Sequence, residues 1–330
     1  MTAPLLQVAG LSKRFATRRS ALALLRGRPA PQLRAVDGVS LDLHRGETLG
    51  VVGESGCGKS TLARCIVRLY EPDEGAILFE GHDALALAGP ARRAYNRRVQ
   101  MVFQDPYGSL NPRLSVGDAL AEALSVHRVV EKPAIPARVR ALLDLVHLPE
   151  DAARRYPHEF SGGQRQRIGI ARALAVEPAI IIADEPVSAL DVSVQAQIVN
   201  LFLELQAGLG LALVFITHDL RLVRHIAHRT AVMYLGRVVE TGPTEALFQA
   251  PAHPYTQALI QAVPQIAPGA RSRAAAVQGE LPSATAPPPG CPFHPRCPIA
   301  EPQCRTLVPA LVTRTAPWPA ACHLAGAPRP

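Results

Sequence analysis

The sequence predicts an α/β fold built on a parallel core sheet. Three observations favour it: apolar segments of strand length alternate with helix-like segments, a glycine-rich segment follows one apolar strand, and two carboxylates end another. Strands that alternate with helices form parallel sheets covered by helices. The 330 residues allow two domains, or one large α/β domain with an appendage.

Composition separates a globular body from a different C-terminal end. Hydrophobic residues make up 48% and charged residues 19%, which excludes wholesale disorder, collagen-like proteins and coiled coils. Of the 31 prolines, 17 follow residue 250, as do four of the six cysteines. The net charge of +8 suits nucleic acid, anionic lipid or phosphate ligands, and alone it does not choose among them.

No segment has the pattern of a secretory signal or a spanning helix. The N-terminus lacks a basic start followed by a long apolar stretch, and no run reaches roughly 18 apolar residues. We therefore expect a soluble chain made in the cytoplasm. In that reducing compartment, clustered cysteines are more often metal ligands than disulfides.

The first half of the chain begins with β structure, which we expect to form an N-terminal antiparallel region. The expected elements are a short hairpin region over 5–8 and 11–15, an exposed basic loop over 17–34, strands over 39–43 and 48–52, and a helix over 60–70.

The second half alternates more regularly. The expected elements are mainly helical residues 115–148 interrupted near 132–136, helix 164–175 before strand 180–183, and helix 193–209 before strand 211–217. Residues 100–175 interrupt the alternation and indicate an inserted helical lobe. The proline- and alanine-rich residues 264–290 indicate a linker before a Cys/Pro-rich C-terminal extension.

A complete phosphate-loop pattern follows the apolar strand over 48–52. Glycines let several backbone N–H groups point at one anion, and the next helix adds its positive end. We expect Lys59 to reach the β- and γ-phosphates, Ser60 to bind Mg²⁺ and Thr61 to support the α-phosphate. Cys57 occupies a variable position of the pattern and is not expected to act as a nucleophile. The loop residues are Gly53, Glu54, Ser55, Gly56, Cys57, Gly58, Lys59 and Ser60.

A second apolar strand ends in Asp184 and Glu185. We expect Asp184 to hold Mg²⁺ through its water shell and Glu185 to polarise the attacking water. The alternative is that Asp184 and Glu185 are an ordinary acidic pair at a strand end. This alternative is credible for the motif alone and becomes weak beside the phosphate loop.

The segment Ser161-Gly162-Gly163-Gln164-Arg165-Gln166 precedes a helical pattern, so its serine and backbone amides can form another anion site. It resembles the signature motif of ATP-binding cassette (ABC) proteins. This resemblance implies an ABC ATPase fold over about residues 5–250, in which the signature contacts the γ-phosphate of ATP held by the opposite subunit. Because only one cassette is present, the chain is expected to dimerise.

The remaining ABC motifs occur in order. Gln104 resembles the glutamine-loop residue that links Mg²⁺ and water to the transport domain, and the Ser188–Asp191 segment resembles the loop between the two ATP sites. His218 resembles the switch histidine that senses the γ-phosphate. Phe15 fits the aromatic residue that the family places against adenine, with a hydrophobic hairpin residue as the alternative; Val36 could also pack against the adenosine.

Three further stretches resemble the ATPases of oligopeptide and dipeptide importers. They cover residues 101–113, 253–259 and 290–298, and Tyr107-Gly108-Ser109-Leu110 resembles the second-ATPase type of that pair. The resemblance implies a different ATPase as partner, two membrane permease subunits and an extracytoplasmic peptide-binding protein. It places the chain peripherally on the cytoplasmic face of the inner membrane.

The tail cysteines are Cys291, Cys297, Cys304 and Cys322, with five, six and seventeen residues between them. This spacing matches neither a zinc ribbon nor the close ferredoxin run. Zinc, an iron–sulfur cluster and four unligated thiols all stay possible on spacing alone. Importers of this family carry a cysteine-rich extension that in some members binds a [4Fe–4S] cluster, so the resemblance favours the cluster, with a structural role.

The function expected is the motor of a peptide importer, using ATP and Mg²⁺. The nucleotide domain is expected over 1–263 and the linker and cysteine-rich extension over 264–330. Nickel or glutathione import has the same architecture. A soluble ABC ATPase acting on nucleic acid and an exporter motor are less favoured, because a second cassette, a long coiled-coil insertion, an aromatic stacking platform and fused spanning helices are all missing from the sequence.

Overall fold

The computed structural model of the chain describes residues 3–16, 32–105, 108, 110–262, 279–314 and 317–325. The chain divides into two compact units: unit 1 comprises Met1–Leu5, Leu43–Thr48 and Ala86–Thr217, and unit 2 comprises Leu6–Asp42, Leu49–Leu85 and His218–Pro330. Residues 17–31 of the basic loop predicted over 17–34, the residues Pro106, Tyr107 and Ser109, and residues 264–278 of the linker predicted over 264–290 lie outside the described residues, while residues 32–34 of the predicted loop belong to a strand.

Unit 1 contains a parallel sheet of β6 (Val99–Val102), β7 (Ile180–Asp184) and β8 (Ala212–Thr217). Val102 pairs with Ala183, and Asp184 pairs with Ile216, so the carboxyl ends of these strands share one edge. Every residue of β7 and β8 is buried, as expected for a parallel sheet covered on both faces. Phe202 of α8 (Val192–Leu209) packs edge-on against Phe215, with the ring centroids 5.9 Å apart.

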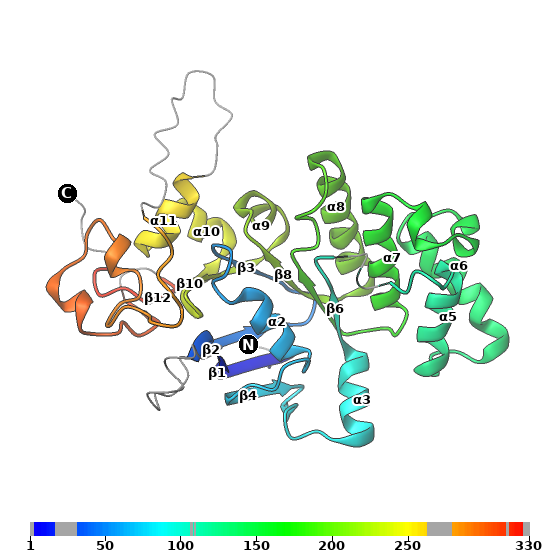
Figure 1. Cartoon of the computed structure of the whole chain (residues 1–330), viewed down its shortest axis with the longest axis horizontal. Helices are drawn as coiled ribbons and strands as arrows, with labels where there is room; N and C mark the ends of the chain where they lie inside the picture. Colours follow the sequence, from blue (N-terminus) through cyan, green and yellow to red (C-terminus); the bar gives the residue numbers. More distant parts are fainter. Residues whose placement is uncertain are drawn as a thin grey trace, which may run out of the picture. The chain divides into compact units, whose positions relative to one another are not determined.

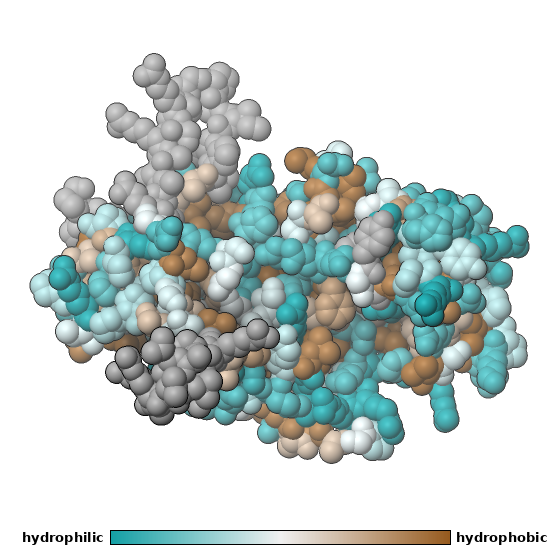
Figure 2. Space-filling model, in the orientation of Figure 1, coloured by the Kyte–Doolittle hydropathy of each residue, from teal (hydrophilic) through white to brown (hydrophobic). Residues whose placement is uncertain are grey.

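The rest of unit 1 is mainly helical, as predicted for residues 115–148, whereas the helix over 89–98 was not predicted. Its elements are α3 (Gly89–Arg98), α5 (Val116–Val126), η1 (Lys132–Ala134), α6 (Ile135–Leu145), η2 (Glu150–Arg154), η3 (Pro157–Glu159) and α7 (Gly162–Leu174). α5 buries Val116, Leu120 and Leu124, which are four residues apart and form one face. α5, α6 and α7 lie side by side (Figure 1), and hydrophilic residues cover much of the α5–α6 surface in Figure 2.

Unit 2 begins with an antiparallel sheet in the strand order β2-β1-β4-β5. Its strands are β1 (Leu6–Ala16), β2 (Gln32–Leu43), β4 (Glu74–Phe79) and β5 (His82–Asp83). The hairpin predicted over 5–8 and 11–15 is wrong, because these residues form one strand. Gly10 has a φ of 58°, and the register with β4 shifts between Ala9 and Ser12, so a bulge interrupts the alternation that suggested two strands.

A second sheet of unit 2 carries the phosphate loop. β3 (Thr48–Val52) pairs in parallel with β9 (Arg229–Tyr234), and β9 pairs antiparallel with β10 (Arg237–Pro243). Helix α2 (Lys59–Ile66) is four residues shorter than the predicted 60–70 at its C-terminal end. Arg68 has a φ of 58°, which a continuing helix does not allow.

The C-terminal extension is built on the same sheet. After α9 (Leu220–Ile226), α10 (Thr244–Gln249) and α11 (Pro254–Gln261), the chain forms η4 (His294–Arg296), η5 (Pro302–Arg305), β11 (Val312–Thr313) and β12 (Pro319–Ala320). β12 pairs antiparallel with β10 through Glu240 and Ala320. Figure 1 shows this extension, in orange and red, beside β10 and α11.

Within the described ranges, none of the helices combines the length and the apolar character needed to cross a membrane.

Candidate nucleotide-binding site

The phosphate loop turns tightly because two of its glycines have no room for a side chain. Gly58 has a φ of 105°, and a Cβ there would lie 1.9 Å from the carbonyl oxygen of Ala35. Gly53 has a φ of 156°, and its Cβ would lie 2.2 Å from the carbonyl oxygen of Met233. The loop is therefore shaped by backbone segments far from it in sequence.

Lys59 and helix α2 follow the loop directly. The Lys59 ammonium is buried and donates hydrogen bonds to the carbonyl oxygens of Gly53 (2.8 Å) and Glu54 (3.0 Å). The N-cap of α2 is Gly58, and no side chain caps the helix. The first amides of α2, including those of Ser60 and Thr61, thus begin a helix whose positive end has no capping side chain, which suits a phosphate.

Cys57 is a buried member of the loop. Burial raises the pKa of its thiol, which keeps the sulfur neutral and unsuited to nucleophilic attack. Its backbone carbonyl accepts a hydrogen bond from the amide of Gly236 at 2.8 Å. Cys57 therefore serves the loop through its backbone carbonyl, and its sulfur accepts a long contact of 3.9 Å from the Lys59 ammonium.

Sequence reasoning missed the groups that hold Glu54. Its amide donates to the hydroxyl of Tyr255 at 2.9 Å, and its carboxylate accepts two bonds from Arg296 at 2.8 and 2.9 Å. Tyr255 and Arg296 follow Glu54 by more than 200 residues. No local sequence pattern predicts contacts over such a separation. Tyr255 and Arg296 nevertheless lie in two of the segments that resemble peptide importers.

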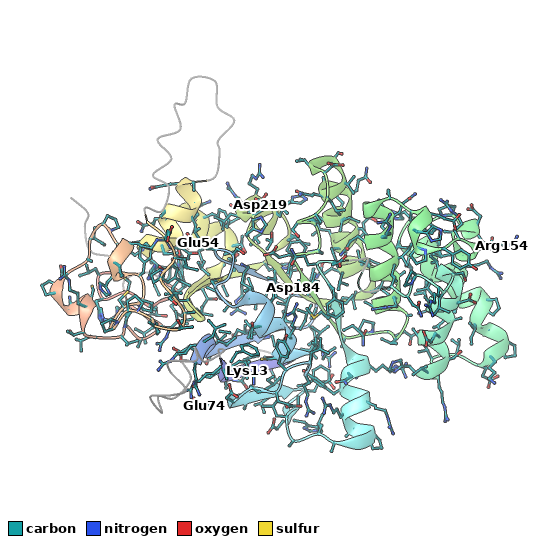
Figure 3. All side chains as sticks on the ribbon, viewed as in Figure 1. Lys13, Glu54, Glu74, Arg154, Asp184 and Asp219 are labelled. Atoms are coloured by element: carbon teal, nitrogen blue, oxygen red, sulfur yellow. The ribbon has the colours of Figure 1, made fainter. Side chains whose placement is uncertain are left out.

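In unit 1, three predicted residues stand at the carboxyl edge of the parallel sheet. Asp184 ends β7 (Figure 3) and is 2% exposed, while Glu185 follows it with a φ of 47°. Gln104 follows the paired end of β6 by two residues and is exposed. A left-handed conformation at a non-glycine residue is strained, and such strain is concentrated at functional sites. Carboxylate and amide oxygens at one edge are the donors that Mg²⁺ prefers.

The signature segment begins α7. Ser161 is its N-cap: the hydroxyl oxygen of Ser161 accepts from the amide of Gln164 at 3.3 Å, and the Gln164 side-chain oxygen accepts from the Ser161 amide at 3.0 Å. This reciprocal capping box was visible in the Ser-x-x-Gln spacing and was missed. Gly162 and Gly163 start the helix, and a Cβ on Gly163 would lie 2.4 Å from a Val194 methyl group.

The other predicted residues have local roles in the structure. His218 is exposed and directly follows β8 in sequence, and Asp219 caps α9 by accepting from the Arg221 amide at 2.9 Å. Phe15 is half-buried and packs edge-on against Tyr70, with 5.4 Å between the ring centroids. The Lys13 ammonium lies 5.5 Å from the Phe15 ring centroid.

The segment around His253 anchors the C-terminal extension. Burial lowers the pKa of His253 to about 3, and its neutral ring accepts from the Tyr255 amide at 3.0 Å. The fully buried carboxylate of Glu240 accepts from the amides of Ala252 and His253 and from the Trp318 indole. These bonds tie β10, the start of α11 and the tail together.

The four tail cysteines line one small cavity of about 10 Å³, with His253, His294 and His323 among its other walls. All six cysteines of the chain are free thiols. Burial raises the pKa of Cys291 to about 11 and also raises those of Cys297 and Cys322. Among the described residues, no three His, Cys, Asp or Glu side chains are arranged to hold a metal ion.

Comparisons with known proteins identify the family. The family model "ABC transporter" matches residues 36–188, and "Oligopeptide/dipeptide transporter, C-terminal region" matches residues 239–304. The chain is 54% identical over 294 residues to the "Probable peptide ABC transporter ATP-binding protein y4tS" of Sinorhizobium fredii, covering 89% of this chain and 83% of that protein. It is 50% identical over 300 residues to the oligopeptide transport ATP-binding protein AppF of Bacillus subtilis, covering 90% and 91%.

Among solved structures, the chain resembles the dimeric ATP-binding cassette MJ0796 in a post-hydrolysis state bound to ADP and Pi. The TM-score is 0.63 at 27% identity, covering 72% of this chain and 98% of that one. Together with the phosphate loop and the acidic strand end, these matches settle the class: the chain is an ATP-hydrolysing subunit of the ABC transporter family, in its oligopeptide/dipeptide branch.

Proposed function

We propose that the chain is the motor of an importer of dipeptides and oligopeptides. The observation that carries this proposal is that an ABC cassette and the oligopeptide/dipeptide C-terminal region occur on one chain. Relatives about half identical along most of their length are named for oligopeptide and for di- and tripeptide transport. We extend their cargo class to this chain.

We propose that unit 2 supplies the phosphate site. Gly53–Thr61 wraps the β- and γ-phosphates with backbone amides, and Lys59 exchanges its bonds to the carbonyls of Gly53 and Glu54 for phosphate oxygens. Phe15 packs against the adenine. His218, which lies between β8 and α9 in sequence, senses the γ-phosphate.

Unit 1 supplies the catalytic groups in this proposal. Glu185 positions and polarises the attacking water, without a covalent intermediate. By the resemblance to ABC proteins, Ser60, Gln104 and Asp184 would be the residues that hold Mg²⁺, which neutralises developing charge on the phosphates. Their carboxylate, amide and hydroxyl oxygens fit that ion.

The two ATP sites are completed by a second ATPase. Ser161, Gly162, Gly163 and Gln164 face the γ-phosphate that the partner holds, and the Ser188–Asp191 segment communicates between the sites. The dimeric ADP- and Pi-bound cassette supports such an arrangement. We propose a related but different ATPase as partner, as in the resemblance to the second-ATPase type.

The proposed assembly lies peripherally on the cytoplasmic face of the inner membrane, with two permeases and an extracytoplasmic peptide-binding protein. Residues 1–263 form the nucleotide domain, with the helical lobe at about 100–175 against the permeases, and residues 264–330 form the linker and the extension.

Co-purification and reconstitution test the importer. The tagged chain should pull down two permeases and a second ATPase, and the complex in proteoliposomes should take up labelled dipeptide with ATP and binding protein. The same complex carrying Glu185→Gln is the control and should not transport. Recovery of ribosomes or DNA instead of permeases would contradict import, and stimulation by nickel or glutathione alone would contradict the peptide cargo.

We also propose that the four tail cysteines hold a [4Fe–4S] cluster with a structural role. The chemistry of the donors supports this proposal, since four thiols line one cavity, but in the described residues they are not arranged to hold a metal ion and would have to move to do so. The closed cavity has the volume of about one water, so a cluster requires it to open. Cluster binding also requires the raised-pKa thiols to lose their protons. Iron and acid-labile sulfide in the anaerobically purified chain support the cluster; stoichiometric zinc without iron contradicts it.

A further inference from the structure

The C-terminal extension contributes one charged side chain to the phosphate loop. Arg296, the last residue of η4, donates two hydrogen bonds to the Glu54 carboxylate, at 2.8 and 2.9 Å. A third, longer contact of 3.4 Å reaches the hydroxyl of Tyr234. The side chains of Arg296 and Glu54 are 6% and 26% exposed, so water screens this forked ion pair only partly.

Arg296 is placed by a packed aromatic base. Phe293, three residues earlier, is 1% exposed, and its ring centroid lies 5.3 Å from that of Tyr234 and 5.4 Å from that of Tyr255. Tyr234 and Tyr255 also contact each other at 4.7 Å. The arginine therefore projects from a rigid support, which lowers the entropy cost of holding its fork in one geometry.

Glu54 is held at three points, each from a different element. Arg296 binds its carboxylate, the Tyr255 hydroxyl binds its amide, and the Lys59 ammonium binds its carbonyl. The carboxylate is therefore bonded to the extension, while the carbonyl of Glu54 is bonded within the loop.

The charge arrangement explains why this pairing matters for the reaction. A loop that receives the polyphosphate of ATP carries an acidic residue at its second position, and an unpaired carboxylate there would repel the ligand. Arg296 both neutralises that charge and fixes where it lies. Cys291 and Cys297 flank the same short segment and line the cysteine cavity, so the segment is anchored on both sides.

We propose that Arg296 is a positioning residue for ATP binding: it keeps the Glu54 carboxylate away from the phosphates and the phosphate loop in its binding conformation. The inference rests on the proposed role of Gly53–Thr61 as the phosphate site.

The test compares MgATP affinities of the whole chain and its variants by calorimetry. Arg296→Met should raise the Kd for MgATP about tenfold, because it leaves Glu54 charged and unpaired. Adding Glu54→Gln to that variant removes the stranded charge and should restore the Kd to within about threefold of the starting chain. A purely structural role of Arg296 would give no such rescue. In ATP hydrolysis, Arg296→Met should raise KM more than it lowers kcat.

Two controls make the outcome decisive. Arg305→Met removes an exposed arginine of the same extension and should leave the Kd unchanged. Lys59→Ala should abolish measurable binding, and normal binding by it would overturn the proposed phosphate site itself. If Lys59→Ala loses binding while Arg296→Met does not, or if the double variant binds no better than Arg296→Met, this inference alone is wrong. If Arg296→Met does not fold, Arg296→Lys decides instead, with weakened affinity supporting the inference and unchanged affinity overturning it.

Discussion

The signature segment and the phosphate loop both present glycines and backbone amides, yet they are held in opposite ways. Ser161 and Gln164 cap each other within four residues. The phosphate loop instead fits against the carbonyl of Ala35 and is tied to Tyr255 and Arg296 near the other end of the chain. The start of the signature segment is thus capped by neighbours in sequence, whereas the phosphate loop depends on residues of unit 2 that are remote in sequence.

The largest effect is expected from a variant that removes the proposed catalytic carboxylate and leaves the signature segment and the phosphate loop unchanged. Glu185→Gln keeps the size of the side chain but removes its ability to act as a base, so ATP should bind normally while kcat falls about 10²- to 10⁴-fold. Single-turnover hydrolysis and ATP binding measured on the same sample check this. Unaltered turnover would show that another group polarises the water, and Glu204→Gln, on the exposed side of α8, is the matched control.

The close fit between the phosphate loop and the remote Ala35 carbonyl can be tested by substituting Gly58. Gly58→Ala places a Cβ against the Ala35 carbonyl in a left-handed conformation, so it should destabilise the loop by more than about 3 kcal/mol and eliminate ATP binding. Gly56→Ala is the matched control: its φ is 80°, but nothing lies within 4 Å of the added Cβ, and it should cost only about 1–2 kcal/mol. Equal ATP affinities of the two variants would refute the steric account.

A third prediction concerns the pH dependence of stability that arises from His253, whose ring accepts a hydrogen bond from the Tyr255 amide. Burial lowers the pKa of His253 from 6.5 to about 3, so the unfolded chain binds a proton more readily than the folded one. Its contribution to stability is complete above about pH 6.5 and is lost as the pH falls toward 3, at about 1.4 kcal/mol per pH unit. Urea unfolding between pH 7 and 4 should show this loss.

The same series on His253→Asn gives the comparison, because asparagine can cap α11 without titrating. That variant should lose less free energy of unfolding on acidification than the starting chain, whereas the exposed control His82→Asn should behave like the starting chain. Identical pH profiles for all three chains would remove His253 as the titrating group.

Sequence reasoning succeeded where the signal is local. The strands predicted over 48–52 and 180–183 and the glycine loop are encoded by apolar runs and by residues with special backbone geometry, and the structure has the strands at Thr48–Val52 and Ile180–Asp184. The same locality explains the wrong hairpin, since the bulge near Gly10 breaks the two-residue period inside one strand and imitates a turn.

The contacts that hold the phosphate loop could not be predicted, because the residues that make them lie more than 200 positions away in sequence. The ion pair of Glu54 with Arg296 spans 242 residues, and the hydrogen bond from Glu54 to Tyr255 spans 201. In one sequence, an arginine in a proline-rich tail has no pattern that distinguishes it from a solvated one. Periodicity reports which face of an element is buried, and it does not report what the element packs against.

The smallest expected effect tests a close contact that the signature segment makes outside its own sequence neighbourhood. Gly163→Ala forces a Cβ to within 2.4 Å of a Val194 methyl group at the start of α8, and relieving this overlap should cost about 1–2 kcal/mol of unfolding free energy. Because the obstacle is a single methyl group nearby in unit 1, adding Val194→Ala should recover most of the loss. Gly169→Ala, in the open interior of α7, is the control and should be neutral or stabilising. Thermal unfolding of the starting chain and the three variants decides: if Val194→Ala fails to recover the loss from Gly163→Ala, the segment is held by more than this one contact within unit 1, and the contrast with the phosphate loop weakens.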